Sequence, residues 1–191
     1  MGQVAGLLLA AGAGRRMGRP KALVHDPDGT SWLLRAVTAL ADGGCAPVLV
    51  VLGAGHEPAR ELLRGQDVQV VLARDWEQGM GASLRAGLAA LDGESVEAAL
   101  VTLVDLPDIG ADVVDRVRRC GWDGRSSLAR AIFAGRPGHP VLMGSEHWAA
   151  VCHTAIGDKG ARDHLATHPV RSVDCTDLAS GEDVDHPHPL P

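Results

Sequence analysis

The chain has 191 residues, of which 46% are hydrophobic and 22% charged, a length and composition typical of one globular domain with a packed core. Its formal net charge is −6 and only 3% of its residues are aromatic. These values exclude a broadly basic surface for duplex nucleic acid and an aromatic platform for single strands.

Four continuous apolar runs mark expected strands in the first half of the chain: Val4–Ala10, Val48–Leu52, Val68–Leu72 and Ala98–Val104. Continuous runs indicate strands buried on both faces. Between them, apolar residues recur at helical spacing, first at Leu33, Ala36, Val37 and Leu40 and later at Leu84, Leu88 and Leu91. Strands that alternate with helices predict a mostly parallel sheet with helices on both faces, that is, a single three-layer α/β/α domain over residues 1–191.

The pattern loosens after Asp105, where the elements become shorter. Two apolar segments flank AGRPGHP and predict a hairpin or crossing pair of strands. The expected elements are a helix at Asp112–Arg118, strands at Leu128–Phe133 and Pro140–Met143, helices at Glu146–Val151 and Ala161–His168, and a strand at Val170–Val173. The sequence thus divides into a regular part over about residues 1–108 and a less regular part over about residues 109–191.

The cysteines and apolar runs bear on the compartment. Cys45, Cys120, Cys152 and Cys175 are widely spaced and form no CxxC pair, which favours buried, reduced thiols. The apolar start lacks the pattern of a signal peptide, and no run reaches the roughly 20 residues of a membrane span. We expect a cytoplasmic protein that binds neither nucleic acid nor membrane.

The segment AAGAGRRMGRPKAL (Ala10–Leu23) follows the first expected strand. Glycines let a backbone approach a ligand closely, while arginine and lysine supply donors and charge for phosphate. The loop does not fit the dinucleotide fingerprint G-x-G-x-x-G, because Gly12 and Gly14 are followed by Gly18 one position too late. It does not fit the Walker A loop either, because Arg19 and Pro20 follow Gly18 where that motif has Lys and Ser or Thr. The alternative is a solvated glycine-rich connection with incidental arginines, but the clustered cations favour an anion-binding loop.

The same segment resembles the signature of the MobA-like NTP transferase family, L-A-[AG]-G-x-[SG]-x-R-[ML]-G-x-x-K. Two further segments, WEQGMGASLRAGL and LVDLP, resemble those of the family as a whole. Three more resemble those of its molybdenum cofactor cytidylyltransferase branch: GRPGHPVLM, GDKGARDHL and GEDVDHP. The resemblance implies a Rossmann-like sheet of the nucleotide-diphospho-sugar transferase type. It also implies a Mg²⁺-dependent nucleotidyltransferase, with a nucleotide-binding half over about residues 1–108 and an acceptor-binding half over about residues 109–191.

The resemblance assigns site residues across the chain. Catalytic roles fall on Arg16, Lys21 and Asp105. Nucleotide binding falls on Leu9, Ala10, Ala11, Gly12, Gly14, Arg15, Gly18, Lys21, Gly81 and Ser83, and acceptor binding on Gly79, Met80, His139 and Asp158. A purely structural role is the alternative for three of them: Ser83 as a helix cap, His139 as a turn histidine and Asp158 as a turn former.

Asp105 follows the fourth expected strand, at the edge where the glycine loop emerges. Mg²⁺ binds one or two carboxylates together with phosphate oxygens and water, so Asp105 is the natural first ligand, with turn capping as the alternative. The resemblance supplies Asp185 as the second ligand, although His186 stands where the family usually has threonine. Leu106 likewise replaces a glutamine of the family.

The implied reaction is transfer of CMP from CTP to the phosphate of molybdopterin carrying molybdenum, with release of pyrophosphate. The motif Leu9-Ala10-Ala11-Gly12 follows the cytidylyl form, whereas guanylyl relatives tend to read L-A-G-G. A molybdoenzyme that receives the product is the expected protein partner. Three alternatives remain: another phosphorylated acceptor such as a sugar phosphate or a phospholactate, an NAD(P)H-dependent dye reductase of the nicotine blue type, and a non-catalytic binding module.

Nine histidines raise the question of a zinc site. No HExxH motif is present, and no paired spacing is evident, so none is predicted. The tail segment HPHP is expected to bind metal only weakly and adventitiously.

Overall fold

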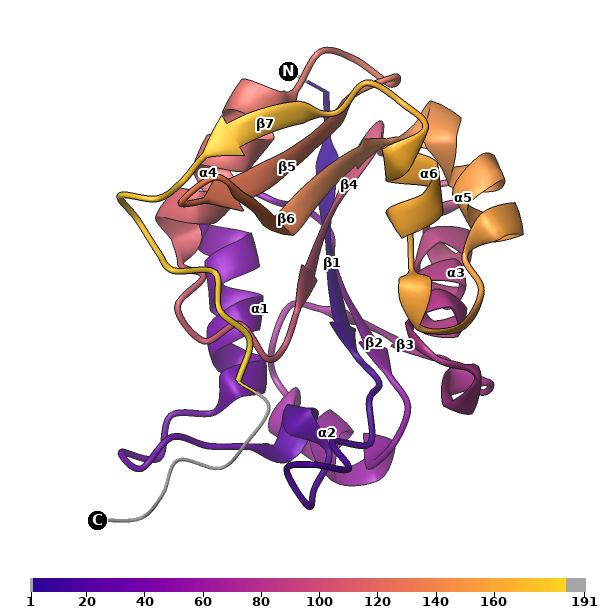
Figure 1. Ribbon diagram of the computed structural model, residues 1–191. Helices are drawn as coiled ribbons and strands as arrows, with labels where there is room; N and C mark the ends of the chain where they lie inside the picture. Colours follow the sequence, from indigo (N-terminus) through magenta and orange to yellow (C-terminus); the bar gives the residue numbers. More distant parts are fainter. Residues whose placement is uncertain (1, 185–191) are drawn as a thin grey trace.

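The computed structural model describes residues 2–184, which fold around one seven-stranded sheet of order β3-β2-β1-β4-β6-β5-β7 (Figure 1). The strands are β1 (Val4–Ala10), β2 (Val48–Leu52), β3 (Gln69–Leu72), β4 (Ala98–Leu103), β5 (Leu128–Phe133), β6 (Arg136–Gly144) and β7 (Arg171–Asp174). Strand β6 is antiparallel to β4 and β5, whereas the other described pairs are parallel. The sheet is therefore mostly parallel, as predicted.

Helices cover both faces of the sheet. They are α1 (Trp32–Asp42), α2 (His56–Leu62), α3 (Met80–Leu91), α4 (Ala111–Gly121), α5 (Trp148–Thr154) and α6 (Arg162–Ala166), with short 3₁₀ turns at Lys21–Leu23, Trp76–Gln78, Ser145–His147 and Gly157–Lys159. The side chain of Ser31 caps α1 by accepting a hydrogen bond from the amide of Leu34 (3.4 Å).

Two apolar cores show how the layers pack. Side chains alternate along β1, so that Leu8 and Ala10 pack with α1 and α4 on one face. Leu7 and Leu9 pack with α3 and α5 on the other face. The expected three-layer α/β/α architecture is confirmed, and none of the described helices is long and apolar enough to cross a membrane.

Some local expectations differ from the structure. The helix α2 is absent from the prediction because Ala59 is its one fully buried residue, so its sequence carries no apolar period. Strand β3 is an edge strand rather than one buried on both faces, and its Leu72 is 43% exposed. The thiols form no disulfide within the described chain, but Cys120 is exposed, contrary to the expectation of burial.

Candidate active site

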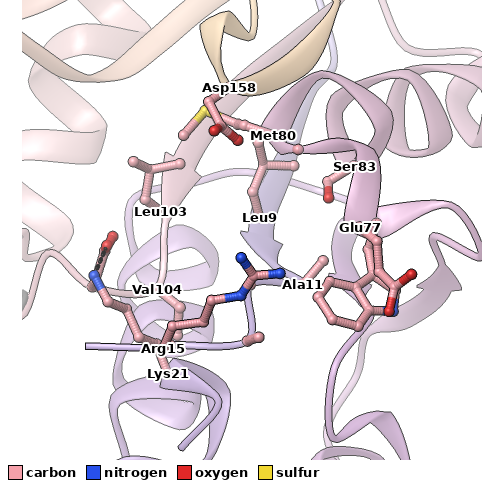
Figure 2. Close-up of a pocket in the computed structure, with 16 residues that line it drawn as sticks. Leu9, Ala11, Arg15, Lys21, Glu77, Met80, Ser83, Leu103, Val104 and Asp158 are labelled. Atoms are coloured by element: carbon pink, nitrogen blue, oxygen red, sulfur yellow. Dashed lines mark hydrogen bonds and ion pairs between the residues drawn. The ribbon is translucent and has the colours of Figure 1, made fainter. Parts of the chain in front are cut away.

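A cavity of about 340 Å³ lies where the carboxyl ends of β1 and β4 meet the start of α3 (Figure 2). Ligands of open α/β sheets bind at this edge. We call it the loop cavity; its lining residues are Leu9, Ala11, Gly12, Ala13, Gly14, Arg15, Lys21, Trp76, Glu77, Gly79, Met80, Ser83, Leu103, Val104, Asp105 and Asp158.

The glycine-arginine loop forms one wall of this cavity. Gly14 has φ +58°, and a Cβ there would lie 2.0 Å from the carbonyl oxygen of Arg19, so glycine alone fits. A Cβ on Gly12 would instead meet no atom within 4 Å, which leaves open space for a ligand against the backbone. The guanidinium of Arg15 points toward the middle of the cavity (Figure 2). The wall thus combines accessible backbone amides with a guanidinium group, and both suit phosphate oxygens.

Lys21 and Asp105 meet across the floor of the loop cavity. The ammonium donates to the carboxylate at 2.6 Å (Nζ to Oδ2), and the side chains are only 15% and 17% exposed. Each charge compensates the other where little water reaches them. A triphosphate would give Lys21 an anionic partner and leave the carboxylate of Asp105 available for a cation. The pair is therefore suited to exchange partners when substrate enters.

The opposite wall is the start of α3 and the turn that packs against it. Gly79 has φ +103°, and a Cβ there would lie 2.6 Å from Asp158 Oδ1, so glycine is required for this close approach. The 12-residue helix begins at Met80 and directs its positive end toward the cavity, which favours an anion. Ser83 in its first turn is buried and lines the cavity.

A second cavity of about 450 Å³ adjoins the first, and we call it the sheet cavity. Leu9, Met80, Leu103 and Asp158 line both cavities, so the two form one continuous cleft. Apolar side chains from β4, β6 and α6 form much of its wall, among them Val101, Val141, Met143 and Leu165. Such a surface suits a planar organic group.

His139 lines the sheet cavity from β6. Its side chain is partly exposed to the cavity, but the protein around it removes most of its water, and this desolvation lowers its pKa to about 4. The charge of Asp105 opposes the shift but does not cancel it. His139 is therefore a neutral imidazole at pH 7, able to donate and accept hydrogen bonds.

Arg130 brings a positive charge into the sheet cavity from β5. Its Nε atom is buried and has no hydrogen-bond partner among residues 2–184. Buried polar groups are normally satisfied, so the unpaired Nε is unusual, and the position of Arg130 in the cavity lining lets its guanidinium offer positive charge to an anionic group. Sequence analysis missed Arg130; the available signal was a lone arginine in the apolar strand LARAIF.

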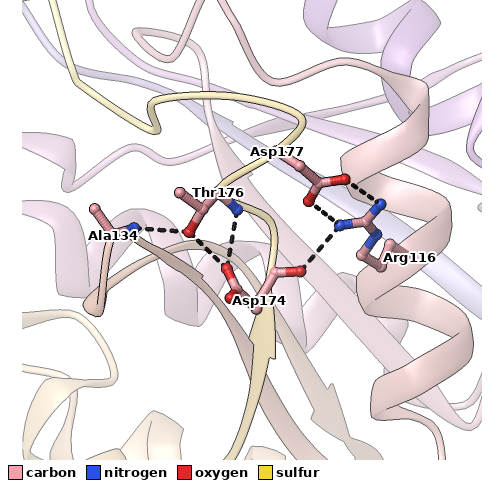
Figure 3. Close-up of polar contacts among 5 residues, drawn as sticks. All are labelled: Arg116, Ala134, Asp174, Thr176 and Asp177. Carbon is pink, nitrogen blue, oxygen red and sulfur yellow. Dashed lines mark hydrogen bonds and ion pairs between the residues drawn. The ribbon is translucent and has the colours of Figure 1, made fainter.

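Residues 175–184, which we call the return segment, connect β7 to the floor of the loop cavity. Arg116 of α4 donates to both carboxylate oxygens of Asp177, and Asp174 accepts from Thr176 (2.6 Å between side-chain oxygens; Figure 3). Further along, Asp108 Oδ2 accepts from the amide and the hydroxyl of Ser180 (2.6 Å each).

The return segment ends next to the acidic residue of the site. The amide of Val184 donates to the carbonyl oxygen of Asp105 at 3.0 Å. Asp185 follows in the sequence but lies outside the described residues.

The structure gathers most of the predicted site residues in one cleft. Leu9, Ala11, Gly12, Gly14, Arg15, Lys21, Gly79, Met80, Ser83, Asp105 and Asp158 line the loop cavity, and His139 lines the sheet cavity. Ala10, Arg16, Gly18 and Gly81 lie nearby without lining either one. Gly79 and Met80, predicted for the acceptor, border the loop cavity, and Met80 also reaches the sheet cavity.

A phosphate-suited loop, a cation–carboxylate pair and a three-layer sheet together define a nucleotide-binding α/β protein of the nucleotidyltransferase class. Residues 6–173 match the family described as the MobA-like NTP transferase domain. The chain belongs to this family, and it is a nucleotidyltransferase of the MobA-like type.

The similar proteins carry two kinds of name. Nicotine blue oxidoreductase of Paenarthrobacter nicotinovorans is 38% identical over 190 residues, which cover 95% of this chain and 92% of that protein. Molybdenum cofactor guanylyltransferase of Rhodobacter capsulatus is 35% identical over 150 residues, 78% of this chain and 67% of that one.

Solved structures give the same fold. Rv0371c of Mycobacterium tuberculosis H37Rv superimposes with a TM-score of 0.81 at 28% identity and covers 97% of this chain and 93% of its own. A complex of Rv0371c with manganese superimposes with a TM-score of 0.74 at 25% identity, covering 90% and 88% of the two chains. A divalent cation therefore accompanies this fold in at least one relative.

Proposed function

We propose that this nucleotidyltransferase transfers CMP from CTP to the phosphate of molybdopterin carrying molybdenum and releases pyrophosphate. The observation that supports this proposal most directly is the Lys21–Asp105 ion pair, with Nζ and Oδ2 2.6 Å apart, in a cavity that the glycine-arginine loop lines. A triphosphate and a divalent cation are the natural partners of these two charges.

Asp105 and Asp185 would hold Mg²⁺. The donor set fits because both ligands are carboxylates, as this ion prefers. Support for Asp185 comes from its neighbour Val184, whose amide is hydrogen-bonded to the carbonyl of Asp105. When bound, the ion neutralises charge on the phosphate oxygens.

Within this proposal, the protein contributes position and charge. Loop amides at Gly12 and Gly14 together with Arg15 orient the triphosphate, and Arg16 and Lys21 offset its charge. A phosphate oxygen of the acceptor attacks the α-phosphorus in line and forms a new P–O bond. The bond to the bridging oxygen breaks, and pyrophosphate leaves with its electron pair. Such transfers need little covalent chemistry from the protein.

The base preference is supported by the size of one side chain. Ala11 is buried and lines the loop cavity, where guanylyl relatives tend to have glycine. Its methyl group narrows the cavity and favours a pyrimidine over a purine. Ser83, on the facing wall, would offer a hydroxyl to the base.

The sheet cavity supports the choice of acceptor. It is largely apolar and so suits the planar pterin, while Arg130 and His139 offer polar contacts for its phosphate and ring nitrogens. Asp158, on the shared wall, would orient the acceptor relative to the nucleotide.

The test is pyrophosphate release with CTP, GTP, ATP or UTP and Mg²⁺, with and without molybdenum-loaded molybdopterin. We expect release that requires both CTP and the pterin and is abolished in Asp105→Asn. A clear preference for GTP would disprove the base assignment, and release independent of the pterin would disprove the acceptor.

A second candidate is reduction of a dye by NADH or NADPH. It is favoured by the similarity to nicotine blue oxidoreductase, which spans more of the chain than the similarity to the guanylyltransferase. The loop could hold the pyrophosphate of a dinucleotide, and the apolar sheet cavity could hold an aromatic dye. Hydride transfer, however, gives Asp105 no role. Loss of nicotinamide absorbance in the presence of dye, unaffected by Asp105→Asn, would favour this candidate.

A further inference from the structure

Three histidines converge at a place that the proposed reaction does not use. His147, in the turn before α5, lies beside His164 and His168 of α6 and the turn that follows it. One ring nitrogen from each lies within 4.8 Å of the others. His164 is buried, His147 is partly buried and His168 is exposed. The expectation of no paired histidine spacing was wrong, because His164 and His168 are four residues apart.

Backbone carbonyls fix the orientation of two of the rings. His147 Nε2 lies 3.0 Å from the carbonyl oxygen of Ser126, and His168 Nδ1 lies 2.8 Å from that of His164. A carbonyl oxygen only accepts, so each of these nitrogens carries a hydrogen and the other nitrogen of each neutral ring has a lone pair. Histidine ligands of metal ions are held by the same arrangement, with the second N–H on a carbonyl.

The third ring closes the cluster. His164 Nε2 lies 3.0 Å from His147 Nδ1, the lone-pair nitrogen of that ring. Without a metal, His164 donates this hydrogen bond; with one, His164 carries its hydrogen on Nδ1 and both facing nitrogens become ligands. Nitrogens bound tetrahedrally to zinc lie roughly 3.3 Å apart, given Zn–N bonds of about 2.05 Å. His147 and His164 are near this spacing. The ring of His168 is stacked on that of His164, with centroids 4.0 Å apart and an interplanar angle of 24°. Binding therefore requires the exposed His168 ring to turn out of this stack, so that its lone pair points at the same ion.

We propose that His147, His164 and His168 form a binding site for a borderline-soft divalent transition metal, Zn²⁺ in the first instance, with water in the fourth position. Three neutral imidazoles suit Zn²⁺, Ni²⁺ or Cu²⁺, whereas Mg²⁺ requires oxygen ligands. The site is thus chemically distinct from the carboxylate site at Asp105.

The position of this site indicates a structural role. Strand β6 runs antiparallel to β4 and pairs its last residue, Gly144, with Ala98 at the start of β4. His147 therefore lies near the amino end of β4, whereas Asp105 follows the carboxyl end of the same strand. A bound ion would join the turn before α5 to α6, and α6 supplies Arg162 and Leu165 to the sheet cavity. The metal would thus stabilise the position of α6 in the wall of that cavity without contacting the reacting groups.

The test uses untagged full-length protein carrying His186→Gln and His188→Gln, which removes the imidazoles of the HPHP tail. After treatment with chelating resin, Zn²⁺ is titrated calorimetrically without nucleotide, and Tm is measured with and without Zn²⁺. We expect one ion per chain and a Tm increase of about 5–10 °C when free Zn²⁺ exceeds its Kd about a hundredfold. Mg²⁺ should not reproduce this increase.

Two matched variants identify the ligands. His168→Gln removes an exposed ligand and should weaken Zn²⁺ binding by about 100-fold or more, since even losing an outer-shell partner costs about 10–100-fold. His153→Gln changes an exposed histidine of α5 outside the cluster and should bind Zn²⁺ as the parent does. Equal Zn²⁺ binding by both variants, or no stoichiometric binding by the parent, would overturn the proposal. Nucleotide transfer enters neither readout, so the two proposals fail independently.

Discussion

The loop cavity and the sheet cavity share a wall but are built differently. One short segment, from Leu9 to Lys21, supplies seven of the residues that line the loop cavity. The sheet cavity draws on β4, β5, β6 and α6, with residues such as Val101, Arg130 and Leu165 far apart in the chain. The comparison teaches that one cavity can be formed largely by a single contiguous motif, whereas another depends on how segments distant in sequence pack together.

The largest expected effect tests the loop cavity. Lys21→Ala should lower kcat/KM by about 10²- to 10³-fold, because it removes a charge that stabilises the triphosphate in the transition state. Pyrophosphate release measures the loss, and circular dichroism checks that the fold is intact. Arg64→Ala, at a side chain 76% exposed, is the control and should be near wild type. Full activity of Lys21→Ala would show that the loop cavity is not the reaction site.

The next effect separates the two cavities. Arg130→Met should raise KM for the acceptor by about 10- to 100-fold, the effect of losing a charge-assisted hydrogen bond, and leave KM for CTP within about twofold. Its Tm should not fall, because the substitution removes a buried nitrogen that has no hydrogen-bond partner in the described chain. Arg125→Met, at an exposed arginine, is the matched control. A rise in KM for CTP instead would indicate that both cavities bind the nucleotide.

A smaller effect concerns the choice of base. Ala11→Gly should shift relative turnover toward GTP by about 10-fold, the scale expected from one methyl group in a binding pocket. The measurement is the ratio of kcat/KM for CTP and GTP. Ala10→Gly gives the adjacent residue, which does not line the cavity, a similar gain in flexibility and should leave the ratio unchanged. If both variants changed the ratio equally, loop flexibility rather than cavity size would set the preference.

The smallest effect is a pH dependence in the sheet cavity. The folded protein lowers the pKa of His139 from 6.5 to about 4, so the unfolded chain binds the proton more readily. His139 therefore contributes stability that is present above pH 6.5 and lost as the pH falls toward 4. We expect this loss to be about 1–2 kcal/mol, discounted for the exposed part of the ring. Urea unfolding at several pH values should show a shallower acid slope for His139→Asn, and equal slopes would contradict the assignment.

The same contrast explains how far the sequence predicts the structure. Continuous apolar runs predicted β1, β2 and β4 closely, and the loop motif predicted the residues of the loop cavity. Arg130 was missed because the expected pairing of β5 with β6 does not reveal that residues of β4 and α6 enclose a cavity beside it.

The histidine cluster was missed for a similar reason. His164 and His168 form a local pair, but His147 reaches them through the packing of α5 with α6. Long-range pairing of this kind leaves no local period in the sequence.

The return segment has a consequence for the order in which the molecule assembles. The contact between Val184 and Asp105 joins residues 79 positions apart in sequence, and the bonds of Asp108 to Ser180 span 72. During synthesis, the strands around the loop cavity can pair while β7 and the residues after it are still inside the ribosome. The backbone hydrogen bond from Val184 to Asp105 then forms only when residue 184 has emerged. A nascent chain can therefore pair these strands well before the backbone at Asp105 is held by its last partner.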